Sequence, residues 1–179
     1  MYNTLYYKTI KEWFNKLAKI KNSIFLGQQV YYEDFYGLLK DVDKSKRIEM
    51  PVAEEMQLGI SIGLALEGFL PISIYQRMDF LPRAMDQLVN HLDLIKDLSH
   101  NLFNPKVIII TTVGSKYPLD TGLQHSKDLT KGLKSLLRNV KVYNPKTAKQ
   151  ADIAFKKSLK YDGSSILIFY QDLWKRIKK

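Results

Sequence analysis

Apolar side chains recur along this chain in two patterns, one typical of surface helices and one typical of buried strands. Residues 5–20 place apolar side chains at spacings of three and four with lysines between them, which predicts an amphipathic helix. Residues 106–113, KVIIITTV, are rich in β-branched side chains and continuously apolar, as in a strand covered on both faces of a parallel sheet. We expect this strand to lie at the centre of the sheet.

The rest of the chain continues this alternation of strands and helices. Further strands are predicted at residues 24–30, 47–51, 70–75, 141–143 and 165–171. Further helices are predicted at residues 54–67, from Pro82 to about Asn101, through 129–137 and at 147–159, with a long loop over 114–123. Strands that alternate with helices favour βαβ units. The predicted fold is therefore α/β, with three α/β/α layers and a mainly parallel sheet of about six strands.

Length and composition favour a single domain. The 179 residues are 45% hydrophobic, which is enough for a sizeable core. We expect residues 1–22 to form a helix packed on the domain, residues 23–173 to form the domain itself and residues 174–179 to form a basic tail. The chain has no cysteine, no signal-peptide pattern and no apolar run near the roughly 20 residues of a membrane span. These features favour a cytoplasmic protein without a membrane partner.

The formal net charge of +10 raises the question of an acidic partner. The basic residues are dispersed over the first helix, a loop at 44–47, residues 156–160 and the tail, and no nucleic-acid-binding motif accompanies them. A solvated basic surface is the favoured interpretation. A nucleic-acid-binding domain is an alternative that depends on charge alone, and an acidic partner subunit is a further use of the charge.

Three motifs in a fixed order carry candidate chemistry: PVAEEMQLGISIG at 51–63, MDFLPRAMDQLVN at 78–90 and GLQHS at 122–126. Together they resemble the pyrimidine-binding domain of thiamine-diphosphate enzymes, over roughly residues 20–173. The closest resemblance is to the beta subunit of the decarboxylating component of 2-oxo-acid dehydrogenase complexes. It implies the thiamine-diphosphate-binding fold of transketolase-like enzymes. It also implies that thiamine diphosphate is shared with a diphosphate-binding alpha-type subunit, which holds the Mg²⁺ ion.

The resemblance assigns roles to three side chains. Glu54 matches the glutamate that donates a hydrogen bond to the pyrimidine ring nitrogen and so activates the cofactor, and Phe80 matches an aromatic residue beside that ring. His125 matches an active-site histidine that contacts the substrate. Without the resemblance, Glu54 would be an ordinary first-turn acid, Phe80 a core residue and His125 a surface or capping residue.

Three glutamines depart from the pattern of the family. Gln28 and Gln29 stand where a strand end commonly carries acids near the cofactor or the partner subunit, and Gln76 stands at a usually apolar position of the pocket. We expect Gln28 and Gln76 to contribute to cofactor binding, since amides keep the capacity for hydrogen bonds without the charge. The chain also lacks the Gly-Asp-Gly segment that holds a metal-bound diphosphate, and it ends without the carboxy-terminal domain of the resembled beta subunits.

Two hypotheses of function follow from these features. In the first, the chain is a pyrimidine-binding subunit, inactive alone, of an enzyme that decarboxylates a 2-oxo acid or transfers a ketol unit from a ketose. In the second, it is a degenerate, non-catalytic family member that acts as a binding or regulatory module. Gly59 and Gly63 suggest that a second backbone approaches the predicted helix closely. That backbone would belong to a partner in a homodimer or heterotetramer, or to the sheet of this chain.

Overall fold

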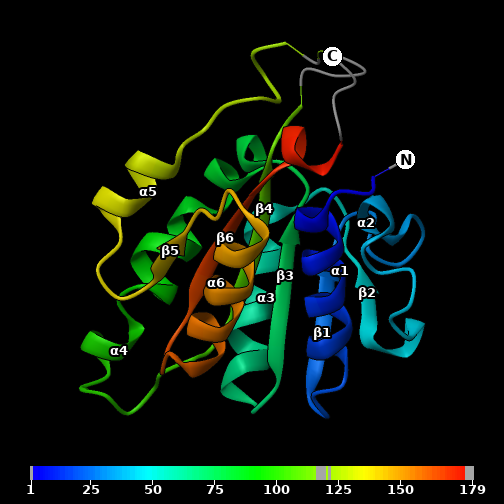
Figure 1. Ribbon diagram of the computed structural model, residues 1–179. Helices are drawn as coiled ribbons and strands as arrows, with labels where there is room; N and C mark the ends of the chain where they lie inside the picture. The colour runs from blue at the N-terminus through cyan, green and yellow to red at the C-terminus, as the bar shows by residue number, and fades with distance from the viewer. Residues whose placement is uncertain (1, 116–119, 121, 176–179) are drawn as a thin grey trace.

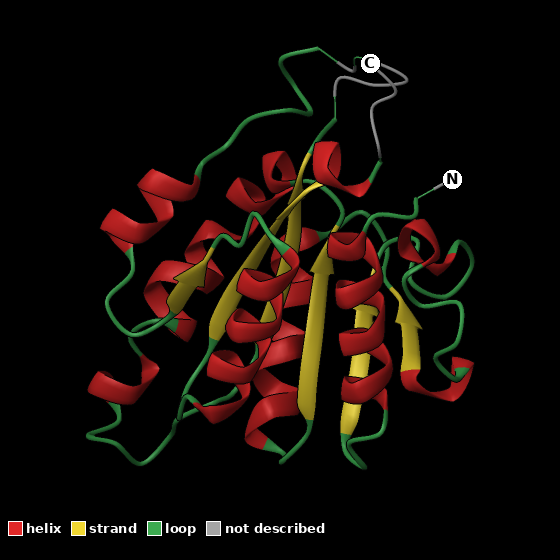
Figure 2. Cartoon of the chain, viewed as in Figure 1, coloured by secondary structure: helices red, strands yellow, loops and turns green. Residues whose placement is uncertain are grey.

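The chain folds around one β-sheet, as Figures 1 and 2 show. The computed structural model describes residues 2–115, 120 and 122–175. The strands are β1 (Ser23–Gly27), β2 (Arg47–Glu49), β3 (Leu70–Tyr75), β4 (Ile108–Val113), β5 (Lys141–Tyr143) and β6 (Ser165–Tyr170). Their order across the sheet is β2-β1-β3-β4-β6-β5, and each neighbouring pair is parallel. The prediction that residues 106–113 form a central strand is confirmed, because β4 lies between β3 and β6.

Helices cover both faces of this sheet, which confirms the predicted fold class. The α-helices are α1 (Leu5–Ala18), α2 (Asp34–Gly37), α3 (Glu54–Leu66), α4 (Ile95–Leu98), α5 (Thr130–Leu136) and α6 (Ala148–Lys160). Short 3₁₀ or π segments are η1 (Lys44–Lys46), η2 (Met78–Ala84), η3 (Gln87–Leu92) and η4 (Gln171–Trp174). In the view of Figure 1, α1 and α6 lie in front of the sheet and α3 lies behind it.

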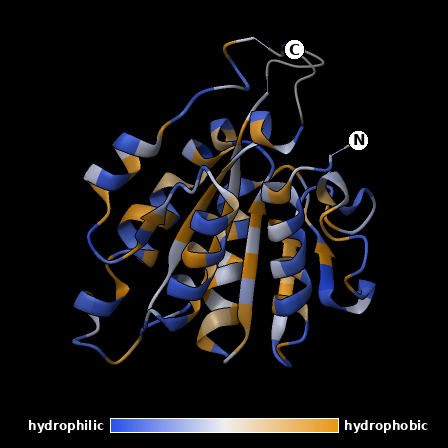
Figure 3. Cartoon of the chain, viewed as in Figure 1, coloured by the Kyte–Doolittle hydropathy of each residue, from blue (hydrophilic) through white to orange (hydrophobic). Residues whose placement is uncertain are grey.

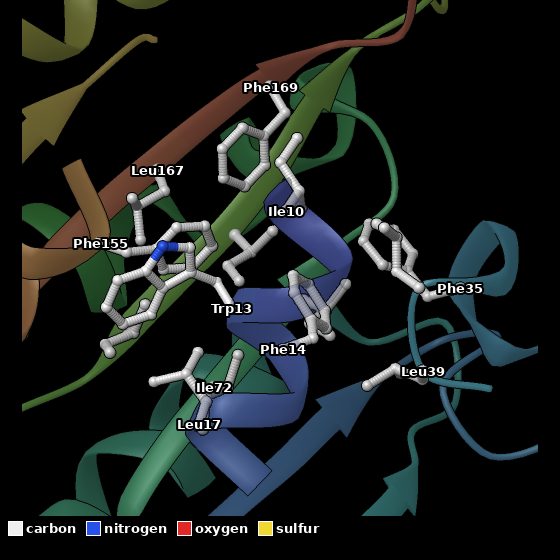
Figure 4. Close-up of a cluster of buried hydrophobic side chains, with 14 of the residues drawn as sticks. Ile10, Trp13, Phe14, Leu17, Phe35, Leu39, Ile72, Phe155, Leu167 and Phe169 are labelled. Atoms are coloured by element: carbon white, nitrogen blue, oxygen red, sulfur yellow. The ribbon is translucent and has the colours of Figure 1, made fainter. Parts of the chain in front are cut away.

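The strands divide their side chains between two hydrophobic cores, one on each face of the sheet. Along β4, Ile110 points into the core under α1 and α6, whereas its neighbour Ile109 points into the core under α3 and η2. In the first core, Trp13 of α1 stacks on Phe155 of α6 with 5.3 Å between the ring centroids (Figure 4). Figure 3 shows hydrophobic residues along the strands and hydrophilic residues on the helices that cover them. These cores hold the strand ends in fixed positions.

The last described residues join the first core. Trp174 is fully buried, and its ring centroid lies 5.4 Å from that of Tyr2, 5.7 Å from that of Tyr7 and 5.5 Å from that of Tyr36. It was the first residue of the predicted basic tail. Residues 176–179 of that tail, and residues 116–119 and 121 of the predicted loop, lie outside the described part of the chain.

The prediction of one long helix from Pro82 to about Asn101 is wrong. The chain forms the 3₁₀ segment η2, the π segment η3 and the short α4 instead. The backbone N–H of Asp93 bonds to the carbonyl of Leu88, five residues earlier, at 3.0 Å. This widened turn directs the Asp93 carboxylate inward, where it accepts N–H bonds from Asn139 at 2.8 Å and Val140 at 2.7 Å. A contact distant in sequence therefore interrupts the regular helix.

The other predicted elements differ from the structure at their ends. The helices predicted at 54–67, 129–137 and 147–159 are confirmed as α3, α5 and α6. Strands β1 and β2 end at Gly27 and Glu49, short of the predicted residues 30 and 51. The chain turns after β1, where Gln29 adopts a left-handed conformation with φ of 59°. None of the helices in the described part of the chain is both long and apolar enough to cross a membrane.

Candidate functional site

The residues predicted from the sequence gather where β1 and β3 end. Gln28 follows β1, Gln76 follows β3, Phe80 lies in η2, and Glu54 begins α3. In the sheet, β2 lies on one side of β1 and β3 on the other, so the order of the strands reverses between β1 and β3. Open parallel sheets bind ligands at such a point, outside the carboxyl ends of the strands. The fold therefore brings these four residues to the edge at which α/β sheets bind ligands.

Glu54 is a buried acid with an exposed cation as its partner. Its side chain is 3% exposed, and its Oε2 accepts a hydrogen bond from Nε of Arg83 at 3.0 Å, whereas the Arg83 side chain is 71% exposed. The N-cap residue of α3, Ala53, offers no side chain to the first turn, so the acids at the start of α3 face free N–H groups and the positive end of the helix dipole. Glu55, by contrast, is exposed to solvent.

The position of Glu54 is also fixed through its backbone. The hydroxyl of Tyr75, at the end of β3, donates a hydrogen bond to the carbonyl oxygen of Glu54 at 3.1 Å. Burial is the main factor that raises the pKa of Tyr75 above the usual tyrosine value, and the nearby Glu54 adds to it. The phenol therefore keeps its proton at physiological pH. This bond ties the start of α3 to the end of β3.

A narrow cleft joins four of the five predicted site residues. Its walls come from β1, β3, η2 and α3, and the cavity that they enclose measures about 10 Å³. The residues that line this narrow cleft are Gln28, Glu54, Gln57, Ile74, Tyr75, Gln76 and Phe80. About 10 Å³ is the space of a single water. The walls must therefore move apart before a ring can enter between Glu54 and Phe80.

Gln57 is a site residue that the sequence analysis missed. Its side chain is 1% exposed, and its Nε2 donates to Oγ of Ser73 at 3.1 Å and to the carbonyl oxygen of Ile74 at 3.0 Å. It stands one helical turn after Glu54 on the same face of α3. The spacing of three residues from Glu54 could have indicated in the sequence that Gln57 shares its face of the helix. A glutamine within a helix is, however, more often a surface residue.

A wide pocket of about 430 Å³ lies next to the narrow cleft, and Gln76 and Phe80 line both. The residues that line this wide pocket are Gln29, Glu33, Tyr36, Gln76, Arg77, Phe80 and His125. The rings of Phe80 and His125 meet edge to face, with centroids 5.5 Å apart and planes at 76°. The structure thus brings His125 to Phe80 and Gln76, whereas Glu54 does not line the wide pocket.

The backbone around His125 is held close to the sheet by Gly114. Nη1 of Arg77 donates a hydrogen bond to the carbonyl oxygen of His125 at 3.3 Å. A Cβ at position 114, just after β4, would lie 2.0 Å from that oxygen and 2.1 Å from Nη1 of Arg77. Both contacts are impossible for a real side chain, so the approach requires glycine at this position. The role of Gly114 was not visible in the sequence, where it appeared only as a loop residue.

Hydrogen bonds at the three glutamines join neighbouring strand ends. Nε2 of Gln76 donates to the carbonyl oxygen of Gln28 at 3.2 Å, and the carbonyl oxygen of Gln76 accepts a hydrogen bond from Thr112 of β4. The N–H of Gln29 donates to Oε1 of Glu49 at 2.6 Å. The carboxylate at this strand end therefore comes from Glu49, which the sequence analysis did not single out.

A third hollow, of about 630 Å³, lies on the outer side of Glu54 along α3. Its lining includes Val52, Met56 and Ile60, which are 72%, 46% and 39% exposed. A Cβ at Gly63 would meet nothing within 4 Å, and one at Gly59 would meet the Gln87 side chain at an ordinary 3.6 Å. Packing against the sheet of this chain therefore does not require glycine at either position.

The side chains around the narrow cleft suit a flat heterocycle with ring nitrogens. They are a buried carboxylate on Glu54, the aromatic face of Phe80 and the amides of Gln76 and Gln57. A nitrogen heterocycle stacks on an aromatic ring and pairs at its edge with carboxyl or amide groups. In the described part of the chain, no three His, Asp or Glu side chains gather in a way that could hold a metal ion.

Comparisons with known proteins agree with this chemistry. A family model described as the transketolase pyrimidine binding domain matches residues 6–175. The pyruvate dehydrogenase E1 component subunit beta of Gracilaria tenuistipitata var. liui is 26% identical over 186 residues, covering 99% of this chain and 56% of that protein. The 3-methyl-2-oxobutanoate dehydrogenase subunit beta of Mycobacterium tuberculosis is 39% identical over 56 residues, 31% of this chain and 16% of that protein. The chain spans little more than half of the length of the first relative.

A solved structure shares the fold. It is a split-gene transketolase in an inactive beta4 tetramer, with a TM-score of 0.65 and 19% sequence identity. The similarity covers 93% of this chain and 49% of that chain. At this level of identity the likeness concerns the arrangement of the sheet and its helices.

Proposed function

The chain belongs to the family of transketolase pyrimidine-binding domains, and we propose that it is the pyrimidine-binding subunit of a two-chain thiamine-diphosphate enzyme. The proposed reaction is decarboxylation of a 2-oxo acid, as the names of the dehydrogenase relatives suggest, or transfer of a ketol unit from a ketose, as the family description suggests. The observation that carries the proposal is the buried carboxylate of Glu54, which shares the narrow cleft with Gln28, Gln76 and Phe80.

Each side chain has a distinct role in this proposal. When bound, thiamine diphosphate would supply the carbon that attacks the substrate carbonyl. Glu54 would donate a hydrogen bond to the ring nitrogen, Phe80 would pack on the ring, and Gln28 and Gln76 would line its edge. His125 lies beyond Phe80 in the wide pocket, where it would face the substrate and stabilise negative charge that develops there.

The diphosphate and its Mg²⁺ are assigned to a second chain. This sequence has no Gly-Asp-Gly segment, and the narrow cleft offers groups that suit a ring and no cation for a diphosphate. We place the contact with an alpha-type subunit, or with a second copy of this chain, on the exposed apolar side chains Val52, Met56 and Ile60. They line the hollow next to Glu54, so a partner seated there would reach the cofactor site.

A second candidate function, a non-catalytic binding module, is favoured by the ion pair of Glu54 with Arg83. An ionised carboxylate accepts hydrogen bonds and cannot donate one. In the pair with Arg83, Oε2 of Glu54 acts as an acceptor, so the activating role needs either a proton on Oε1 or an opened pair. The solved split-gene transketolase was also captured in an inactive tetramer. In the enzyme proposal, the pair opens when the partner and the cofactor bind.

Reconstitution separates the two candidates. The chain should be co-purified with the product of a neighbouring reading frame that carries Gly-Asp-Gly and a downstream Asn, and 2-oxo-acid decarboxylation should be assayed with and without thiamine diphosphate. The enzyme proposal predicts turnover that needs both chains and the cofactor. A stable complex without cofactor-dependent turnover of 2-oxo acids or ketoses would favour the binding module.

A further inference from the structure

The wide pocket contains a cation whose role is open. Arg77 directly follows Gln76 at the end of β3 and is half-buried. Among the described residues that line the pocket, it carries the permanent positive charge, and Glu33, which is exposed, carries the negative charge. The Arg77 guanidinium thus stands in the same pocket as the rings of Phe80 and His125.

Arg77 differs from the other described arginines: Arg47 and Arg83 are paired with carboxylates, whereas Arg138 has no such pair but is exposed and lies outside the pocket. The buried Arg47 is paired with Asp34 at 2.5 Å, and Arg83 is paired with Glu54 at 3.0 Å. Among the residues that the structure describes, no carboxylate lies within 4.0 Å of the Arg77 guanidinium. A half-buried arginine without a carboxylate, in a pocket of ligand size, is suited to an anion from outside the chain.

The guanidinium is also held in position. Its Nη1 bonds to the carbonyl oxygen of His125, and that oxygen is packed against Gly114. A guanidinium has five N–H donors in a fixed plane, so this one bond leaves others for a ligand. Because the same contact places His125, a molecule bound by Arg77 would lie beside the imidazole.

We propose that Arg77 binds the anionic group of the substrate, with the reacting carbonyl of the substrate towards His125 and Phe80. The inference rests on the proposed function and names the group that selects the substrate. Two sources share the required chemistry: the carboxylate of a 2-oxo acid and the phosphate of a phosphorylated ketose. Arginine binds both through paired N–H donors in one plane.

The test uses the full-length chain with isotope-labelled histidine. Its three histidines give few imidazole signals in an NMR spectrum, and His91 and His100, which do not line the pocket, serve as internal references. Pyruvate and inorganic phosphate are titrated separately. We expect a saturable shift of the His125 signals. Arg77→Gln should weaken binding by about tenfold or more, because a hydrogen-bonded charge is lost.

Two further variants make the result specific. Arg77→Lys keeps the charge but lacks the planar guanidinium. Its affinity for the anions should therefore lie between that of Arg77→Gln and that of the wild type. Arg138→Gln removes one exposed positive charge outside the pocket and should bind as the wild type does. Thermal unfolding of each variant verifies that it is folded. Tighter binding of pyruvate identifies a 2-oxo acid as the source of the anion, and tighter binding of phosphate identifies a phosphorylated ketose.

The inference is overturned if neither anion shifts the His125 signals, or if Arg77→Gln binds both as tightly as the wild type. Failure of the proposed function looks different. If anion binding depends on Arg77 but the complex has no cofactor-dependent turnover, the proposed enzymatic function is refuted and the anion site is retained. If the Arg77→Gln complex still turns over with an unchanged KM for the anionic substrate, the anion site is refuted and the enzymatic function is retained.

Discussion

The two halves of the candidate site are in different states. Around Glu54, the narrow cleft measures about 10 Å³ and the acid is paired with Arg83. Around His125, the wide pocket measures about 430 Å³ and the guanidinium of Arg77 has no carboxylate partner among the described residues. Phe80 and Gln76 form the shared wall. The half proposed for the substrate is thus preformed in the single chain, and the half proposed for the cofactor is closed.

This difference shows what each half needs in order to work. The wide pocket is built from the ends of β1 and β3 and a backbone contact with Gly114, which are all parts of this chain. Arg83 is paired with Glu54, which lines the narrow cleft, and it lies on the same surface as the apolar residues Val52, Met56 and Ile60. A partner seated on that surface could displace Arg83. The comparison therefore predicts weak binding of thiamine diphosphate by the single chain.

The largest expected effect comes from Glu54→Gln in the reconstituted complex. The amide keeps the size of the side chain but has no carboxyl proton, so turnover should fall by about 10²–10⁴-fold, as when a positioned proton transfer is removed. Glu55→Gln is the matched control, since it also removes an acid from the first turn of α3 but is exposed. Its cost is about 0.3–1 kcal/mol of dipole stabilisation. Equal, mild losses of turnover in the two variants would refute the role of Glu54.

Gly114→Ala should damage the wide pocket and spare the narrow cleft. The added Cβ would lie 2.0 Å from the carbonyl oxygen of His125, so the backbone at His125 and the Arg77 side chain must move. We expect a loss of about 1–3 kcal/mol in the free energy of unfolding, together with weaker binding of pyruvate. Gly132→Ala is the control, because a Cβ there would meet nothing within 4 Å. Denaturant unfolding and the NMR titration measure both effects, and a fully stable Gly114→Ala variant would contradict the packing.

Tyr75→Phe should have a smaller effect, at the closed half. It removes the hydrogen bond to the carbonyl oxygen of Glu54 and should cost about 1 kcal/mol of stability. Burial raises the pKa of Tyr75 in the folded chain, whereas the unfolded phenol ionises near pH 10, so this residue lowers stability as the pH rises above about 10. The variant should therefore lose less stability than the wild type between about pH 9 and 11. Tyr32→Phe, at an exposed residue, should behave like the wild type.

The sequence predicted those parts of the fold and site that depend on local pattern. The central strand at 106–113 and the helix that begins at Glu54 follow from runs of apolar and small residues, and both are present as β4 and α3. The prediction of a long helix after Pro82 was wrong because the carboxylate of Asp93 binds backbone N–H groups more than forty residues away, at 138–140. The spacing of apolar residues along the sequence cannot reveal such a long-range contact.

The same distinction applies to the site. Resemblance in short motifs predicted Glu54, Phe80 and His125, and the structure places Phe80 next to each of the other two, in the narrow cleft and in the wide pocket. Glu49 and Gly114 were missed, because the first acts on the backbone of Gln29 and the second on that of His125. Their roles depend on which strands are neighbours in the sheet. The functional roles of the site residues stay predictions until the variants are measured.

The smallest expected effect is the sharpest test of the difference between the halves. Arg83→Gln removes the partner of Glu54 and leaves the wide pocket unchanged. An ion pair with an exposed member is worth about 0.2–1 kcal/mol, so the single chain should bind thiamine, which lacks the diphosphate, up to about fivefold more tightly than the wild type. Its affinity for pyruvate should not change, because Arg77 is untouched.

Arg138→Gln, with the same loss of charge at an exposed residue outside both cavities, controls for net charge. Calorimetric titration of thiamine and the NMR titration of pyruvate give the two affinities on the same samples. Unchanged thiamine affinity in Arg83→Gln would mean that the ion pair does not keep the narrow cleft closed. The closure would then come from Gln57, Gln76 and Phe80, whose side chains line the cleft between β1, β3 and α3. A coupled change in both affinities would mean that the shared wall of Gln76 and Phe80 makes the two halves one site.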